Sequence, residues 1–154
     1  MPMFDATDYA LANWCAPRFA RASLRTLFAL DARLQAIMPS VREPMLGAIK
    51  LAWWREQLEA LDTGATPAEP LLRGVAGILS TDVTGALLSE LATDEPRMDV
   101  LCDVVTRLCN GNQRAARLLQ RLDADDHARV AAGRPLASPA RRALMAAQIR
   151  LLGR

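Results

Sequence analysis

Apolar side chains recur every three to four residues along most of the chain, which is the period of an amphipathic α-helix. One clear stretch lies between Pro17 and Pro39. Its apolar positions are Phe19, Leu24, Leu27, Phe28, Leu30, Leu34 and Ile37. Another stretch covers residues 43–62. Its expected core-facing stripe is Met45, Leu46, Ile49, Trp53, Leu58 and Leu61. No segment alternates apolar and polar residues for long enough to predict a strand, so the pattern predicts an all-α chain.

Turn and capping residues divide this pattern into a bundle of about six to seven helices. The expected helices cover residues 8–15, 17–38, 43–62, 70–79, 82–92, 97–121 and 139–152. Asp82 is expected to cap the fifth helix and Ser138 the last. The sixth helix is expected to kink or break at Asn110-Gly111-Asn112. Residues 123–138 are predicted to form a polar link before the final helix.

The composition supports a helical domain and argues against two kinds of site. The chain has 154 residues, the size of a single domain. It contains 28 Ala and 24 Leu but only 11 Val and Ile together, which favours helix over strand. One His and three Cys argue against a zinc site. Seven aromatic residues are too few to predict a stacking platform for single-stranded nucleic acid.

Charge is distributed unevenly along the chain. The net charge of +2 divides into −5 over residues 1–106 and +7 over residues 107–154. We interpret the basic third as a solvated face that pairs with the acidic front of the same chain. The alternative is a helical module whose basic third binds an anionic partner, either a membrane or nucleic acid, with nucleic acid the less favoured of the two.

Cysteine usage and the N-terminal residues indicate a location. The three cysteines, Cys15, Cys102 and Cys109, are an odd number and imply no disulfide framework, so we expect all three to pack in the core. Residues 1–10 lack the basic and apolar segments of a secretory signal. We therefore expect a cytoplasmic protein, with peripheral contact at the inner membrane as an option.

The segment from Val41 to Glu56 carries the most specific string of the chain. It reads Val-Arg-Glu-Pro-Met-Leu-Gly-Ala-Ile-Lys-Leu-Ala-Trp-Trp-Arg-Glu. This string resembles the squalene and phytoene synthase family, and in particular the branch with the mitochondrial complex I assembly factor and its bacterial relatives. Asp8-Tyr9-Ala10-Leu11 and the segment 24–30 resemble the first two helices of that family. The resemblance is best over residues 1–62 and implies a truncated isoprenoid synthase fold for the whole chain, 1–154.

The resemblance also implies a test for catalysis. Enzymes of this family hold magnesium between two aspartate-rich segments, and carboxylate oxygens suit that hard cation. The first segment should fall at residues 35–39, which read Gln-Ala-Ile-Met-Pro and contain no carboxylate. Asp31 lies one turn earlier and lacks an acidic partner. Asp99 and Asp103 have suitable spacing but lie near an expected helix start, where acidic residues are favoured anyway. We expect no cofactor; Mg²⁺ would be required only by a transferase.

The candidate ligand-binding residues come from the same resemblance. They are Arg21, Arg25, Lys50, Trp53, Trp54 and Arg55. Each also has a plain structural interpretation, as core packing for the two tryptophans and as the polar side of a helix for the four cations. Adjacent residues on a helix point about 100° apart, so Trp53 and Trp54 cannot share one narrow face. We expect one in the core and the other at a helix boundary or in a pocket wall.

The sequence therefore predicts a pseudoenzyme of the squalene and phytoene synthase type. Its expected role is to bind an isoprenoid or lipid-like ligand, or to act as an assembly or interaction factor with a protein partner. The alternatives are an active prenyl diphosphate transferase and the basic module described above. Fold does not determine function, so these roles are separated only by the site.

Overall fold

The computed structural model describes residues 4–95 and 97–153, and these form an all-α bundle without strands. The helices are α1 (Ala6–Cys15), α2 (Arg21–Gln35), α3 (Pro44–Leu61), α4 (Pro70–Ala76), α5 (Gly85–Ser89), α6 (Met98–Leu108), α7 (Arg114–Ala131) and α8 (Pro139–Leu152). Two 3₁₀ turns, η1 (Arg18–Ala20) and η2 (Met38–Ser40), flank α2. The predicted fold class is confirmed.

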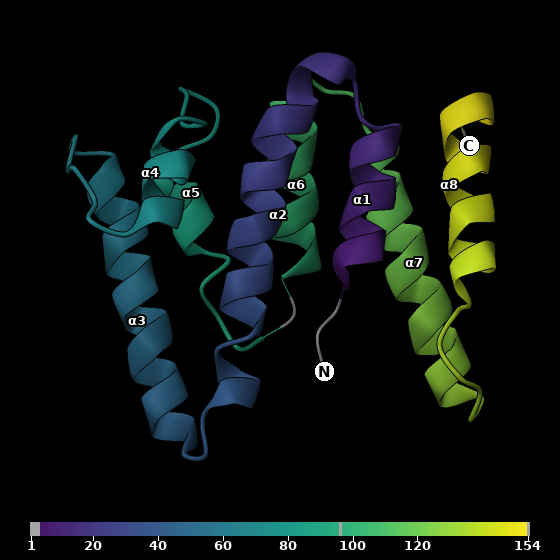
Figure 1. Cartoon of the computed structure of the whole chain (residues 1–154), viewed down its shortest axis with the longest axis horizontal. Coiled ribbons are helices and arrows are strands. Elements are labelled where there is room, and N and C mark those ends of the chain that lie inside the picture. The colour runs from purple at the N-terminus through teal and green to yellow at the C-terminus, as the bar shows by residue number, and fades with distance from the viewer. Residues whose placement is uncertain (1–3, 96, 154) are drawn as a thin grey trace.

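The helices form two ends joined by a central pair (Figure 1). At one end α3 packs against α5 and, more lightly, α4. At the other end α1, α7 and α8 pack on one another. The central helices α2 and α6 contact each other, and α2 also contacts α1 and α4. In Figure 1 α3 and α8 therefore lie at opposite edges of the molecule.

Leucine fills the interior. The largest fully buried side chains are Leu24, Leu27, Leu30, Leu34, Leu58, Leu72, Leu88, Leu91, Leu101, Leu118, Leu119 and Leu122. Burying one such side chain contributes about 1.5–3 kcal/mol, which explains the leucine content. All three cysteines are buried and free, as expected. Burial raises the pKa of the Cys102 thiol to about 12 and that of Cys109 to about 11, so neither is a nucleophile near neutral pH.

The break expected at residues 110–112 is confirmed. It divides the expected helix over residues 97–121 into α6 and the start of α7. Asn110 and Gly111 have positive φ angles of 52° and 84°, which end α6 and let the chain turn into α7. The predicted polar link was wrong over most of its length, because α7 continues to Ala131 and the connection covers only residues 132–138. Leu122 is the last buried residue of α7, so its final turns carry no apolar period to detect.

Two further boundaries differ from the prediction. The expected helix over residues 17–38 is divided into η1, α2 and η2. Thr84, not Asp82, caps α5, and its hydroxyl accepts a hydrogen bond from the Leu87 amide at 3.1 Å. Asp62 also caps this helix from outside, accepting from the amides of Gly85 and Ala86. Ser138 caps α8 as predicted, accepting from the Arg141 amide.

The set of α3 residues predicted to face the core was wrong in the N-terminal half of the helix. The buried residues of this helix are Gly47, Leu51, Trp54, Leu58 and Leu61. The N-terminal members of the predicted stripe, from Met45 to Trp53, face solvent instead. Gly47 explains the rotation, because a Cβ at this position would overlap Sδ of Met38 in η2. The helix therefore turns its glycine, not its larger apolar residues, toward the turn that precedes it.

Candidate functional site

An open groove lies between the end of α2 and the first half of α3. It has a volume of about 610 Å³. Its lining residues are Arg33, Ala36, Ile37, Ser40, Ile49, Lys50, Trp53 and Trp54. None of these residues comes from α6, so the groove does not extend between α2 and α6. The interior at that place holds packed leucines from α2 and α6.

The two tryptophans form one wall of this groove. Trp54 is buried, whereas Trp53 is 44% exposed. Their ring centroids are 5.3 Å apart with an interplanar angle of 85°, an edge-to-face arrangement that aromatic pairs favour. As expected, one of the pair is in the core and the other is not, although both rings line the groove. The buried Trp54 fixes the helix, and Trp53 presents a rigid apolar surface to the groove.

Two cations border the groove without partners. Arg33 comes from the last turn of α2 and Lys50 from α3, and both are exposed. Within residues 4–95 and 97–153, neither side chain has an ion pair or a hydrogen bond. Residues 44–54 contain no acidic side chain. The groove thus combines positive charge with an apolar wall, which suits a molecule with an anionic head and an apolar body.

The structure brings together three of the six candidate residues, Lys50, Trp53 and Trp54, and places the other three elsewhere. Arg21 donates to the carbonyl oxygens of Ala16 and Trp14, both at 3.3 Å, and so holds the turn after α1.

Arg25 borders a second, mostly apolar groove of about 400 Å³ between α1 and α2, which includes Phe28. Arg55 donates to the carbonyl oxygen of Ala92 at 2.9 Å, and Glu59 accepts from the Ser89 hydroxyl. Arg55 therefore ties α3 to the segment after α5 and faces away from the groove of Lys50. Arg33 was missed by sequence reasoning. The only signal for it is its position one turn before η2, the turn that joins α2 to the Trp-Trp helix.

Asp31, the carboxylate nearest the expected aspartate-rich segment, is fully buried in a polar cluster. Its Oδ1 accepts from Nε of Arg97 at 3.0 Å. Its Oδ2 accepts from the Tyr9 hydroxyl at 2.5 Å and from Nε2 of Gln35 at 2.6 Å. Burial, followed by the negative charge of Asp31, raises the pKa of Tyr9. Both oxygens of Asp31 therefore serve internal contacts that join α1, α2 and the start of α6.

The second acidic pair lies on the surface. Asp99 and Asp103 line a hollow of about 310 Å³ between α6 and α7. Asp103 accepts from Nε of Arg107 at 3.0 Å. Across the described part of the chain, no three His, Cys, Asp or Glu side chains are grouped so as to hold a metal ion. Over the same residues, no helix has the length and apolar character needed to cross a bilayer.

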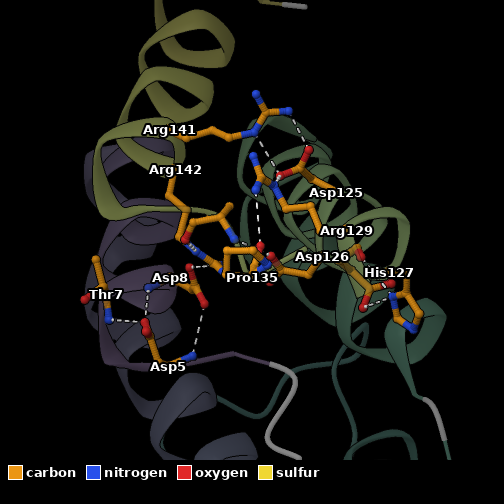
Figure 2. A network of polar contacts seen from close by, with 12 residues as sticks. Asp5, Thr7, Asp8, Asp125, Asp126, His127, Arg129, Pro135, Arg141 and Arg142 are labelled. Carbon is orange, nitrogen blue, oxygen red and sulfur yellow. Dashed lines mark hydrogen bonds and ion pairs between the residues drawn. The ribbon is translucent and has the colours of Figure 1, made fainter. Parts of the chain in front are cut away.

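A cluster of ion pairs holds α8 against α1 and α7 (Figure 2). Arg142, which is buried, donates from one guanidinium nitrogen to Asp8 at 2.6 Å and from another to Asp126. Asp125 accepts from Arg141 at 2.6 Å and from Arg129 at 3.0 Å. Of these pairs, only the one between Arg142 and Asp8 joins the basic third to the acidic front, as the charge distribution predicted. Asp125 and Asp126 belong to the basic third itself, so their pairs do not offset its net charge of +7.

The same cluster contains the cap of α1 and a group with a perturbed pKa. The Asp5 carboxylate accepts from the amides of Thr7 and Asp8, and the Asp8 carboxylate accepts from the Asp5 amide. This reciprocal pattern is a capping box. Hydrogen bonds from Arg141, followed by those from Arg129, hold the pKa of Asp125 at about 2. His127 is exposed in α7, and its Nδ1 lies within 3.1 Å of the Asp123 carboxylate.

Comparisons with known proteins add no name to this geometry. No family model, no curated protein and no solved structure matches the chain. The class that the fold defines is an all-α helical bundle with a cationic, aromatic-walled groove.

Proposed function

We propose that this chain is a non-catalytic, squalene/phytoene synthase-like protein that binds an isoprenoid or lipid-like molecule with an anionic head. The observation that carries the proposal is the groove between α2 and α3, whose lining includes Trp53 and two cations, Arg33 and Lys50, that have no ion pair or hydrogen bond within the described residues. By contrast, Arg97, Arg129 and Arg141 already have acidic partners.

The two parts of such a ligand meet matching surfaces. The anionic head lies between Arg33 and Lys50, where hydrogen bonds to charged groups contribute about 1.5–3 kcal/mol each. The apolar tail lies on Ile37, Ile49 and Trp53, and each methylene removed from water contributes about 0.8 kcal/mol. The volume of about 610 Å³ falls within the range of roughly 300–1,000 Å³ that small-molecule sites occupy.

Two observations support a role without prenyl transfer. Residues 35–39 carry no carboxylate, and the neighbouring Asp31 has both oxygens engaged by Tyr9, Gln35 and Arg97. The alternative, an active prenyl diphosphate transferase, would have to hold magnesium through other residues. Incubation with farnesyl diphosphate and magnesium separates the two: product above the background of a heat-inactivated sample would replace our proposal by the transferase.

Calorimetric titration with farnesyl diphosphate in magnesium-free buffer tests the binding role. We expect saturable binding that weakens at least about tenfold in the Arg33→Gln/Lys50→Gln double variant, a change of about 1.4 kcal/mol. Arg73→Gln is the matched control, because Arg73 is an exposed arginine of α4 outside the groove. Farnesol, which lacks the diphosphate, should bind the wild type and the double variant equally. Equal affinity of the double variant and the control for farnesyl diphosphate would refute the site.

A further inference from the structure

The outward face of α3 is apolar where a helix at the edge of a bundle is normally polar. Met45 is 74% exposed, Leu46 49%, Ile49 58% and Trp53 44%. These residues lie opposite the buried side of the helix, which is formed by Gly47, Leu51, Trp54 and Leu58. We call these four exposed residues the α3 face. Singly exposed apolar residues are ordinary, but a continuous set on one helix indicates an interaction surface.

The position of α3 leaves this face uncovered. The helix lies at one edge of the molecule in Figure 1 and packs inward against η2, α4 and α5. Ile49 and Trp53 belong both to the α3 face and to the lining of the groove. Through these two residues the apolar surface continues from the outside of the helix into the groove, which Lys50 also lines.

The charged residues around the α3 face indicate what kind of partner covers it. Between residues 44 and 54 the only charged side chain is Lys50. Arg42 precedes the helix and Arg33 lies across the groove, and both are exposed. The nearest acidic side chains are Glu43 and Glu56, one at each end of the face. An apolar helix face with a tryptophan and flanking cations is the pattern of a segment that lies in the interface of an anionic bilayer.

The openness of the groove also indicates that the partner is a bilayer. A lipid-like tail bound along Ile49 and Trp53 would stay partly in water, because no other helix covers this side of α3. We propose that the α3 face docks on the surface of an anionic phospholipid bilayer and that the groove takes its ligand from that surface. This inference rests on the proposed ligand class, and it adds the place where the ligand is exchanged. The bilayer then supplies the apolar surroundings that the protein itself lacks.

Flotation with lipid vesicles tests the docking. The probe is a vesicle of phosphatidylcholine with phosphatidylglycerol at roughly a third, compared with phosphatidylcholine alone. We expect the wild type to float with the anionic vesicles and to be released as salt rises. Met45→Ser/Leu46→Ser should reduce the bound fraction several-fold. The matched control is Leu144→Ser/Leu151→Ser, which removes two equally exposed leucines from α8 at the opposite edge and should leave flotation unchanged.

Soluble-ligand binding separates this inference from the proposed function. Neither Met45 nor Leu46 lines the groove, so the α3 variant should keep the wild-type affinity for farnesyl diphosphate. Vesicle binding without farnesyl diphosphate binding would reject the ligand and keep the docking surface. Equal flotation of the α3 variant and the α8 control would refute the docking. A concentration-dependent dimer that is lost in the α3 variant, with no flotation of the wild type, would replace the bilayer by a second copy of the chain.

Discussion

Trp14 and Trp53 are almost equally exposed, at 41% and 44%, yet their surroundings are opposite. At the α1–α8 end, the Arg150 guanidinium lies 4.2 Å from the centre of the Trp14 ring and also donates to the Trp14 carbonyl oxygen. At the α2–α3 end, Trp53 packs edge-to-face with Trp54, and Lys50, which lines the same groove, has no ion pair or hydrogen bond within the described residues. One tryptophan is part of a completed contact, and the other presents its surface to an open groove.

The charged residues repeat this contrast. At the α1–α8 end, Arg142 lies between Asp8 and Asp126, and Asp125 lies between Arg129 and Arg141. At the other end, the cations of the groove face solvent. The comparison teaches that the cations at the two ends have different tasks. Arg142 and Arg141 beside α8 hold helices together, whereas Arg33 and Lys50 have no ion pair within the described residues.

The largest effect should come from Arg142→Leu. This change leaves Asp8 and Asp126 without their shared partner, and breaking a buried pair in this way costs about 3–5 kcal/mol. Lys50→Leu at the other end should change the free energy of unfolding by less than about 0.5 kcal/mol. Urea denaturation of both variants measures the difference. If the two variants lost similar amounts of unfolding free energy, the cations at the two ends would not differ in their contribution to stability.

A smaller loss is expected where α3 meets α5. A Cβ on Gly85 would overlap the backbone carbonyl oxygen of Leu58, so Gly85→Ala should cost about 1–3 kcal/mol. Gly74→Ala is the control, because its new methyl group would lie 3.5 Å from the Thr26 side chain, an ordinary contact. Because alanine favours a helix more than glycine does, Gly74→Ala within α4 should stabilise the protein by up to about 1 kcal/mol. Thermal unfolding compares the two, and a tolerated Gly85→Ala would mean that α3 and α5 are not in close contact.

The pH dependence of stability should distinguish the charged end. Because Arg141 and Arg129 hold the pKa of Asp125 at about 2 in the folded protein, the stabilisation is complete above about pH 4. It is then lost as the pH falls from about 4 to about 2. Burial raises the pKa of Asp8, which acts in the opposite direction, so a difference measurement is needed. The stability gap between wild type and Asp125→Asn should shrink over this range; a gap independent of pH would contradict the pairing.

The smallest effect is expected at the partly exposed Arg150. Loss of its contact with the Trp14 ring in Arg150→Gln should cost about 0.5–1 kcal/mol, as cation–π contacts at exposed sites do. The fluorescence emission of Trp14 should change at the same time. This change should be absent when Arg150→Gln is made in a Trp14→Phe background. A neutral result would mean that the contact between Arg150 and the Trp14 ring does not stabilise the fold.

Much of this molecule could be predicted from local signals. The break at Asn110 and Gly111 and the divergence of Trp53 from Trp54 depend on neighbouring residues alone. The orientation of α3 could not be predicted, because Gly47 faces Met38 and the larger apolar residues are left outside.

The second half of α7 was missed for a different reason. It is held by ion pairs to α8, and Asp125 and Asp126 each lie 16 positions from their partners Arg141 and Arg142. The groove itself depends on the separation of α2 from α3. The residue pattern within either helix does not indicate this separation, so the groove could not be predicted.

The melting temperature with and without farnesyl diphosphate tests the central contrast most directly, in wild type, in Arg33→Gln/Lys50→Gln and in Arg141→Gln. A ligand that binds only the folded state raises the melting temperature. We predict that the groove variant melts like the wild type but loses the ligand-induced rise. Arg141→Gln should melt lower and keep the rise, because it loses its pair with Asp125 far from the groove. An undiminished rise in the groove variant would contradict the account.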